Sequence, residues 1–436
     1  MTNKLIVLSM DAMVTEDLEY LKTKPNFRKL FAHAASVGKV RTVYPSLTYP
    51  AHTSIITGCK PGKHGIFDNN RVGIKEQHDE DWYIDAEWIR TDDVFKAAKR
   101  AGRSTAGVYW PVTVRHPQID HLIGECFGKW MPGVEPEEMF RRLDTAPEMM
   151  EIIRNNMDRY PEPEKAGPEL CKKNTSDEFL MGCACDVIRR YQPDLLMIHN
   201  CYPDSTRHRY GVFSEKMTEC LDFTDQWLGD MIGAMEEAGI CRQTNFVLLS
   251  DHGQMDYSRR IRLNTKFVRD GMITLAEDGS VADWKMFMKS AGMSAYIYVK
   301  DRSFYEEAYA YLQGLLSEGV WGFEKIRTKE ETEAQYGLYG DYDFMVETDG
   351  YTSFADPWHE PIHNPIDFTN YRLGKATHGY EPEKGPQPVF VAAGPDFRED
   401  TYIPEARIWD EGPTFARLLG SELKDAEGEV LTELLN

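Results

Sequence analysis

The sequence predicts an α/β fold in which helices cover both faces of a central, mostly parallel sheet. Short apolar runs at residues 4–10, 194–198 and 245–250 are typical of strands that are buried on both sides. Helical stretches with apolar residues three and four positions apart, at residues 179–191 and 214–239, alternate with these runs. Buried strands that alternate with amphipathic helices are the pattern of an α/β sandwich.

The composition agrees with a large globular protein and excludes some partners. The chain has 436 residues, of which 42% are hydrophobic, and we expect a single domain over residues 1–436. The formal net charge is -21, and an acidic surface repels nucleic-acid backbones, so we expect no long nucleic acid as a partner. An anionic substrate would be repelled as well, unless bound cations reverse the field locally.

The sequence also suggests a compartment. We recognise no signal peptide in the opening residues, and no apolar run reaches the about 20 residues that span a bilayer. The eight cysteines lack the spacing of a disulfide framework or of a zinc ribbon. We therefore expect a cytoplasmic protein with free thiols and no membrane contact. The sequence does not indicate an oligomeric state.

The first strand, at residues 4–10, is followed directly by Asp11, and then by a helix near residues 26–35 and a strand at 39–43. In open parallel sheets, ligands lie at the carboxyl ends of the strands, which makes Asp11 a candidate. The alternative is a turn or cap residue, because Asp is common after strands.

Thr48 stands ahead of an apolar run that Gly58 closes, and Pro50 suits the first turn of a helix. A hydroxyl at a helix N-terminus lies where free N–H groups and the helix dipole favour an anion. Taken alone, Thr48 is more simply explained as a helix cap. The turn-rich loop at residues 64–70 would bring an amide side chain back over Thr48.

The next segments supply structure rather than chemistry. Residues 93–102 predict a short capped helix that ends at a glycine, and residues 104–109 predict a further strand. The stretch 127–170 is polar and rich in proline, and it carries no motif that we recognise.

Two later strands are followed by candidate metal ligands. Asp204 and His208 are four residues apart, so on a helical turn they share a face and suit one metal, although an ordinary hydrogen-bonded pair fits equally. Asp251 and His252 stand at the end of the strand at 245–250 and can both reach one cation. The alternative for them is a structural Asp–His pair.

Residues 256–372 predict an inserted lobe. Within it we expect strands at 293–299 and 341–346, and a helix through Leu316 that opens with a capping box of Ser303 and Glu306. After the lobe, His378 precedes a strand at 388–393 and an amphipathic C-terminal helix.

The stretch from His359 to His363 matches the HExxH pattern of zinc proteases. That chemistry needs a helix, so that both histidines share a face. Pro361 lies in the middle of the stretch, and proline costs about 3 kcal/mol inside a helix. We therefore reject a protease function.

Five segments together supply three aspartates, three histidines and one hydroxyl, mostly at the carboxyl ends of predicted strands. They divide into two nitrogen and oxygen sites: Asp204, His208 and His378 in one, and Asp11, Thr48, Asp251 and His252 in the other. Mixed histidine and carboxylate ligation suits zinc, while manganese and iron also fit the ligand types.

In order along the chain, these motifs resemble those of the alkaline phosphatase superfamily, and most closely its nucleotide pyrophosphatase/phosphodiesterase branch. The resemblance runs from Val7 to about Phe397. It implies an alkaline-phosphatase-like sandwich that hydrolyses small phosphodiesters or nucleotides with two divalent metal ions, zinc or alternatively manganese. It also implies Thr48 as the nucleophile that becomes phosphorylated, Asn69 as an oxyanion contact, and Tyr49 as the aromatic that packs against a base or leaving group.

Other functions remain as alternatives. Hydrolysis of a C–P bond, as in phosphonoacetate hydrolases, uses the same ligand set but needs cationic contacts to a substrate carboxylate, and the sequence identifies none. A monoesterase would add an arginine clamp or a third metal, and a sulfatase signature is absent. A non-catalytic metal-binding module of the same fold is the alternative from another class, although the nucleophile and all the ligands are present.

Overall fold

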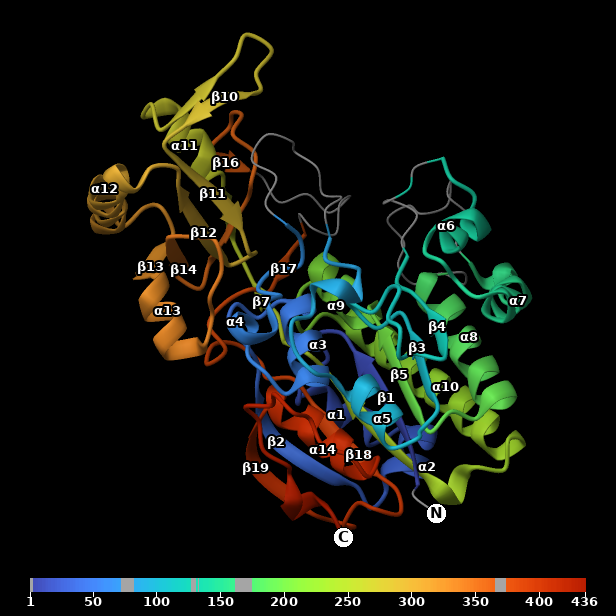
Figure 1. The fold of residues 1–436 in the computed structure, drawn as a ribbon. Coiled ribbons are helices and arrows are strands. Elements are labelled where there is room, and N and C mark those ends of the chain that lie inside the picture. Colours follow the sequence, from blue (N-terminus) through green and yellow to red (C-terminus); the bar gives the residue numbers. More distant parts are fainter. Residues whose placement is uncertain (1–2, 72–81, 127–130, 132, 161–174, 365–373) are drawn as a thin grey trace.

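The computed structural model describes residues 3–71, 82–126, 131, 133–160, 175–364 and 374–436. At its centre lies an eight-stranded sheet with the order β19-β2-β18-β6-β1-β5-β3-β4 (Figure 1). Its strands are β1 (Lys4–Met10), β2 (Ala35–Arg41), β3 (Thr105–Val108), β4 (His121–Ile123), β5 (Leu195–Asn200), β6 (Thr244–Leu249), β18 (Phe390–Ala393) and β19 (Tyr402–Arg407).

The sheet is mixed, with one strand reversed. β18 runs antiparallel to both of its neighbours, β2 and β6, while the other neighbouring pairs are parallel. The prediction of a mostly parallel sheet flanked by helices is confirmed. Because β1, β5 and β6 are parallel neighbours, their carboxyl ends meet at one edge of the sheet.

Alternate side chains of each strand enter two separate cores. On β1, Ile6 and Leu8 pack into one core, and Leu5 and Val7 pack into the other. Helices that fill the first core are α1 (Asp17–Leu21), α2 (Pro25–Phe31), α6 (Pro136–Arg142), α7 (Pro147–Asn155), α8 (Ser176–Tyr191) and α10 (Glu215–Glu237). Helices that fill the second are α3 (Thr48–Thr57), α5 (Val94–Arg100) and α14 (Glu411–Leu418). Both faces are therefore covered, which explains why the strands are apolar throughout.

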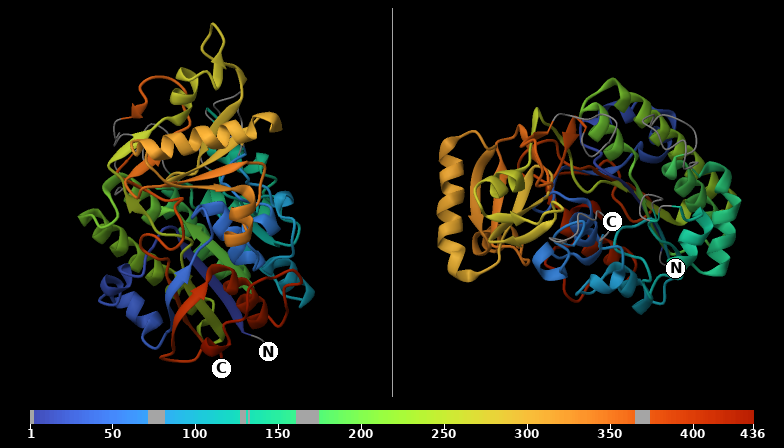
Figure 2. Two further views of the ribbon diagram at one scale, coloured as in Figure 1. Left: turned by 90° about the vertical axis from the view of Figure 1, so that its left-hand side faces the viewer. Right: turned by 90° about the horizontal axis from the view of Figure 1, so that it is seen from above.

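Residues 259–354 contain a second, smaller sheet with its own apolar core. Seen from above, this part lies beside the main body (Figure 2). Its strands are β11 (Met286–Ser290), β12 (Ser294–Val299), β14 (Phe344–Thr348) and β13 (Phe323–Thr328), in antiparallel order. Around them lie α11 (Leu263–Arg269), α12 (Tyr305–Glu318), α13 (Lys329–Tyr336), the hairpin of β9 (Ile273–Leu275) with β10 (Val281–Trp284), and a sheet of β15 (Thr352–Phe354), β8 (Arg259–Ile261) and β16 (His363–Asn364). The extent of this lobe as a domain, residues 256–372, stays a prediction.

Two local predictions differ from the structure, and a third is confirmed by it. The predicted capping box at Ser303 is wrong, because the Ser303 N–H donates to the Asp301 side chain and α12 begins only at Tyr305. The helix expected over residues 26–35 ends at Phe31, since β2 begins at Ala35. His363 lies in β16, so the HExxH stretch is not helical, as its proline predicts.

The remaining general predictions can be compared with the described part of the chain. Of the stretch 127–170, the described residues form α6, α7 and a 3-10 turn, Met157–Arg159, and the rest lies outside the described residues. The seven described cysteines are free thiols. None of the helices in the described ranges has the length and apolarity that spanning a bilayer requires.

Candidate functional site

The candidate site lies where the parallel strands end. Asp11 follows β1, and Asp251 and His252 follow β6. Asp204 and His208 lie one turn apart on α9 (Tyr202–Tyr210), the helix that follows β5. His378 follows β17 (Ala376–Thr377), which pairs with β7 (Met255–Asp256), the strand that comes shortly after His252. All of the predicted ligands are buried.

The first cluster surrounds Nε2 of His252. This nitrogen lies 3.1 Å from Asp251 Oδ2, 3.2 Å from Thr48 Oγ1 and 3.5 Å from Asp11 Oδ1. Four side chains from three separate parts of the chain thus present one atom each to a common point. This is the grouping that the sequence predicts.

The second cluster surrounds Oδ1 of Asp204. His208 Nε2 lies 3.3 Å from this oxygen and His378 Nε2 lies 3.8 Å from it. The rings of His252 and His378 stack with their centroids 4.0 Å apart, so the two clusters are adjacent. The structure therefore brings all seven predicted ligands into one double cluster.

The backbone orients the three histidine rings. Nδ1 lies 2.7 Å from the Ala376 carbonyl in His208, 2.9 Å from the Ser46 carbonyl in His378, and 3.2 Å from the Gly253 carbonyl in His252. A carbonyl oxygen only accepts, so Nδ1 carries the hydrogen in each neutral ring, and Nε2 presents a lone pair. These lone pairs face carboxylate oxygens, an arrangement that is repulsive without a cation between them.

The pKa shifts of the buried groups also favour a bound cation. Burial, reinforced by the charge of Asp251, raises the pKa of Asp11 well above its ordinary value, and burial also raises the pKa of Asp251. Burial lowers the pKa of His252 to about 4, which keeps its imidazole neutral and ready to bind a metal. Asp11 Oδ1 and Asp251 Oδ2 accept no hydrogen bond within the described residues. The donor set therefore fits two divalent cations.

Thr48 is the first residue of α3, with Leu47 as the N-cap, so it is not the cap itself. Its hydroxyl points into the first cluster, and 8% of the residue is exposed, enough to mark it as the margin of the site. The loop that follows α4 (Pro61–His64) returns over this helix start, as expected. Asn69 Oδ1 there accepts a hydrogen bond from the Tyr49 N–H at 2.9 Å.

Tyr49 is placed away from the solvent. It is 1% exposed, its ring lies edge-on to Trp82 with centroids 5.0 Å apart, and its hydroxyl donates to the buried carboxylate of Glu125. Its predicted role in packing against a base or leaving group stays a prediction.

A further set of buried polar residues supports the ligands and was missed in the sequence. Gln254 donates to Asp204 Oδ1, and His199 Nε2 lies 3.1 Å from Asp11 Oδ2. His52 lies beneath Thr48, with Nδ1 2.8 Å from the Thr48 carbonyl. The only sequence signal for this set was proximity to the ligands, as with Gln254 two residues after His252.

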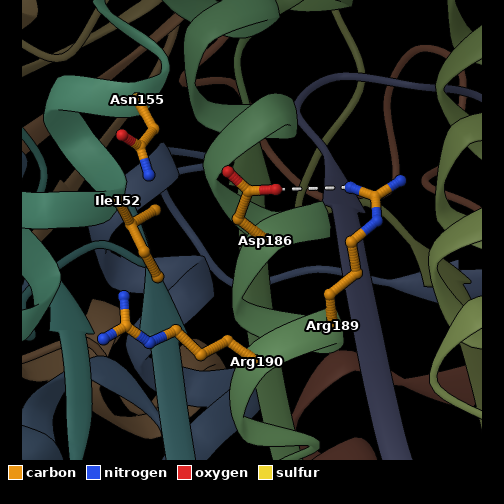
Figure 3. A pocket seen from close by; sticks show the side chains of 5 residues that line it. All are labelled: Ile152, Asn155, Asp186, Arg189 and Arg190. Atoms are coloured by element: carbon orange, nitrogen blue, oxygen red, sulfur yellow. Dashed lines mark hydrogen bonds and ion pairs between the residues drawn. The ribbon is translucent and has the colours of Figure 1, made fainter.

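A surface hollow between α7 and α8 does not belong to this site (Figure 3). It is lined by Ile152, Asn155, Asp186, Arg189 and Arg190. Both arginines are already paired, Arg189 with Asp186 at 3.3 Å and Arg190 with Glu151 at 2.9 Å. No predicted site residue lines the hollow, and each of its two arginines already has an acidic partner.

Comparison with known proteins shows the family of the chain. The sequence model of the type I phosphodiesterase / nucleotide pyrophosphatase family matches residues 5–381. Among curated proteins, a venom phosphodiesterase of Naja atra is 24% identical over 255 residues, which is 57% of this chain and 26% of that protein. Member 3 of the ectonucleotide pyrophosphatase/phosphodiesterase family from Bos taurus is 25% identical over 259 residues, 57% of this chain and 24% of that protein. The matched stretch is thus about a quarter of the length of these curated relatives.

Solved structures share the fold over the full length. Murine ectonucleotide pyrophosphatase/phosphodiesterase 5, an inactive variant in complex with AMP, has a TM-score of 0.71 at 19% identity, and the match covers 100% of both chains. The human form has a TM-score of 0.69 at 19% identity, covering 99% of this chain and 100% of that one. The fold expected from the sequence is confirmed by these structures.

Proposed function

Because the chain belongs to the type I phosphodiesterase / nucleotide pyrophosphatase family, we propose that it hydrolyses small phosphodiesters or nucleotides, with Thr48 as the nucleophile. The observation that carries the proposal is the convergence of His252 Nε2, Asp251 Oδ2, Asp11 Oδ1 and Thr48 Oγ1 on one point at a helix N-terminus. A hydroxyl placed among ligands at a helix start is suited to attack a phosphoryl group.

The seven ligands form two sets, each of which would bind one cation. Asp11, Thr48, Asp251 and His252 would hold one, and Asp204, His208 and His378 would hold the other. When bound, two divalent cations such as zinc or manganese lower the pKa of a hydroxyl or of water and neutralise phosphoryl oxygens. The cations would also explain how a chain with a net charge of -21 binds an anion.

The chain's own groups supply the rest of the reaction. Thr48 Oγ1 attacks phosphorus in line with the leaving group, which departs as the Thr48 ester forms, and water then attacks that ester and frees Thr48. The stacked rings of His252 and His378 are held by backbone carbonyls, so the ligands are fixed before the substrate arrives. Asn69 and the helix start stabilise charge on the equatorial oxygens.

The experiment compares p-nitrophenyl thymidine 5′-phosphate with p-nitrophenyl phosphate, using zinc-loaded protein with and without a chelator. We expect a strong, chelator-sensitive preference for the diester. The Thr48→Ala variant should lose at least about 10³-fold in kcat, as expected for a nucleophile. Full turnover by Thr48→Ala would refute the proposal.

The other outcomes identify the alternatives. Preference for the monoester would support the two metal sites but contradict the diesterase activity. Turnover of phosphonoacetate, with neither ester hydrolysed, would favour C–P bond hydrolysis. Metal binding without turnover of any of the three compounds would favour a non-catalytic module.

A further inference from the structure

A buried ion pair joins the inserted lobe to the loop that carries Asn69. Lys289 lies on β11 of the lobe, and Asp68 lies in the Asn69 loop, which we define as residues 65–71. Lys289 Nζ is 2.5 Å from Asp68 Oδ2 and 3.0 Å from Asn70 Oδ1. The two charged side chains are only 11% and 4% exposed, so this is not a surface pair.

The pair connects to the nucleophile through a short series of hydrogen bonds. Asp68 Oδ1 accepts from the Asn69 N–H at 2.6 Å, while Asp68 Oδ2 faces Lys289. The Asn69 side chain in turn accepts from the Tyr49 N–H at 2.9 Å, next to Thr48. One lysine of the lobe is thus linked, through a carboxylate and an amide, to the start of α3.

A second contact shows that the lobe holds this loop from more than one strand. The Tyr296 hydroxyl, on β12, donates to the Phe67 carbonyl at 2.5 Å. Tyr296 thus holds the backbone just before Asp68, whereas Lys289 binds the Asp68 carboxylate itself. Burial raises the pKa of Asp68, while Lys289, together with the N–H groups of Asn69 and Asn70, opposes that effect, so the lysine favours the charged form of the carboxylate.

We propose that Lys289 is a positioning residue, which sets the Asn69 amide against the nucleophile and so makes the inserted lobe part of the phosphoryl-binding site. The inference rests on the proposed function. A buried carboxylate that loses its cation must neutralise or reorient, and either change moves the Asn69 backbone that it holds. The amide then no longer faces the oxygens on which charge develops.

The test is a double-mutant cycle on diester hydrolysis. We expect Lys289→Met and Asn69→Ala each to lower kcat by about 10²-fold, with KM changed less than about threefold, because both disturb a contact made in the transition state. In the Asn69→Ala background, Lys289→Met should have no further effect on kcat, since it acts only through that amide.

A matched control comes from the same lobe. Lys300→Met removes an exposed lysine that pairs with Asp283, and it should leave kcat and KM unchanged. If Lys289→Met does not fold, Lys289→Gln keeps one donor to Asp68 and enters the same cycle.

Two results would overturn the inference while the proposed function stands. One is a Lys289 variant that melts at a lower temperature but keeps the wild-type kcat, which is the behaviour of an ordinary structural ion pair. The other is a loss of kcat that multiplies with that of Asn69→Ala. If wild type and Thr48→Ala both lack turnover, the proposed function fails, and the positioning role falls with it.

Discussion

Gln254 shows what single residues outside the ligand set contribute. Its amide donates to the Asp204 carbonyl at 3.1 Å and to the Asp204 carboxylate, and both residues are buried. A fixed carboxylate is a better ligand than a mobile one, because less freedom is lost when the metal binds.

Gln254→Ala should therefore weaken metal binding at the second cluster by about 10–100-fold. The measurement is a zinc titration followed by calorimetry, with metal content checked by mass spectrometry. Gln313→Ala, on α12 of the lobe, serves as the control and should bind zinc like the wild type. Unchanged zinc affinity in Gln254→Ala would show that Asp204 needs no support.

At the scale of an element, the segment that carries His378 is held very tightly. Gly379 has φ +90°, and a Cβ there would lie 1.5 Å from the Ala291 carbonyl oxygen of the lobe. Its N–H donates to the Ser46 carbonyl at 3.0 Å, so the glycine allows two backbone segments to meet beside a ligand.

Gly379→Ala should displace His378 and lower both the melting temperature and the zinc content. The control is Gly271→Ala, because Gly271 has φ +75° but no neighbour within 4 Å of an added Cβ. The control should lose only the cost of a left-handed residue, about 1–2 kcal/mol. Equal losses of melting temperature and zinc content in the two variants would show that the contact with Ala291 does not hold His378 in place.

His64 gives the loop after α4 a dependence on pH. Its Nδ1 accepts the Ile66 N–H at 3.1 Å, and its Nε2 lies 2.9 Å from the Ser54 hydroxyl. Burial lowers the pKa of His64 to about 3, below the value of about 6.5 in an unfolded chain. The unfolded chain therefore takes up the proton first, and the stabilisation present above pH 6.5 is lost as the pH falls toward 3.

Urea unfolding at several pH values measures this effect. Below pH 6.5, wild type should lose up to about 1.4 kcal/mol per pH unit more than His64→Gln, which has no proton to take up at that position. Above pH 6.5 the two slopes should agree. Parallel slopes over the whole range would mean that the pKa of His64 is the same in the folded and the unfolded chain.

Elements also show what the sequence can and cannot predict. Asp11, Asp204 and Asp251 could be identified because each follows an apolar run, and the ends of parallel strands share an edge. The reversal of β18 could not, since an apolar strand reads the same in both directions. Lys289 and Asp68 were also missed. They meet only through tertiary packing, and nothing in the local sequence of either residue indicates the other.

At the scale of the whole molecule, the cations of the proposed function should stabilise the fold when they bind. Asp11 and Asp251 are buried close together, and burial with the charge of Asp251 raises the pKa of Asp11, so a cation between the two carboxylates would remove their repulsion. Ligands that bind only the folded state add about 2.7 kcal/mol when present at 100 times their Kd.

Removal of the metal by a chelator should lower the melting temperature, and stoichiometric zinc should restore it. Scanning calorimetry gives the measurement. His378→Ala, which lacks one ligand of the second cluster, should show a smaller shift. A melting temperature that changes neither with chelator nor with zinc would contradict the assignment of both clusters as metal sites.

The position of β18 has a consequence for synthesis on the ribosome. This strand, residues 390–393, pairs on one side with β2 and on the other with β6, and both of these strands precede it by more than 100 residues. A nascent chain that has not yet reached β18 therefore leaves strand edges of β2 and β6 unpaired, and such edges are sites for wrong pairing with other chains. The central sheet closes only after β18 has been translated, and until then these edges are natural targets for chaperones.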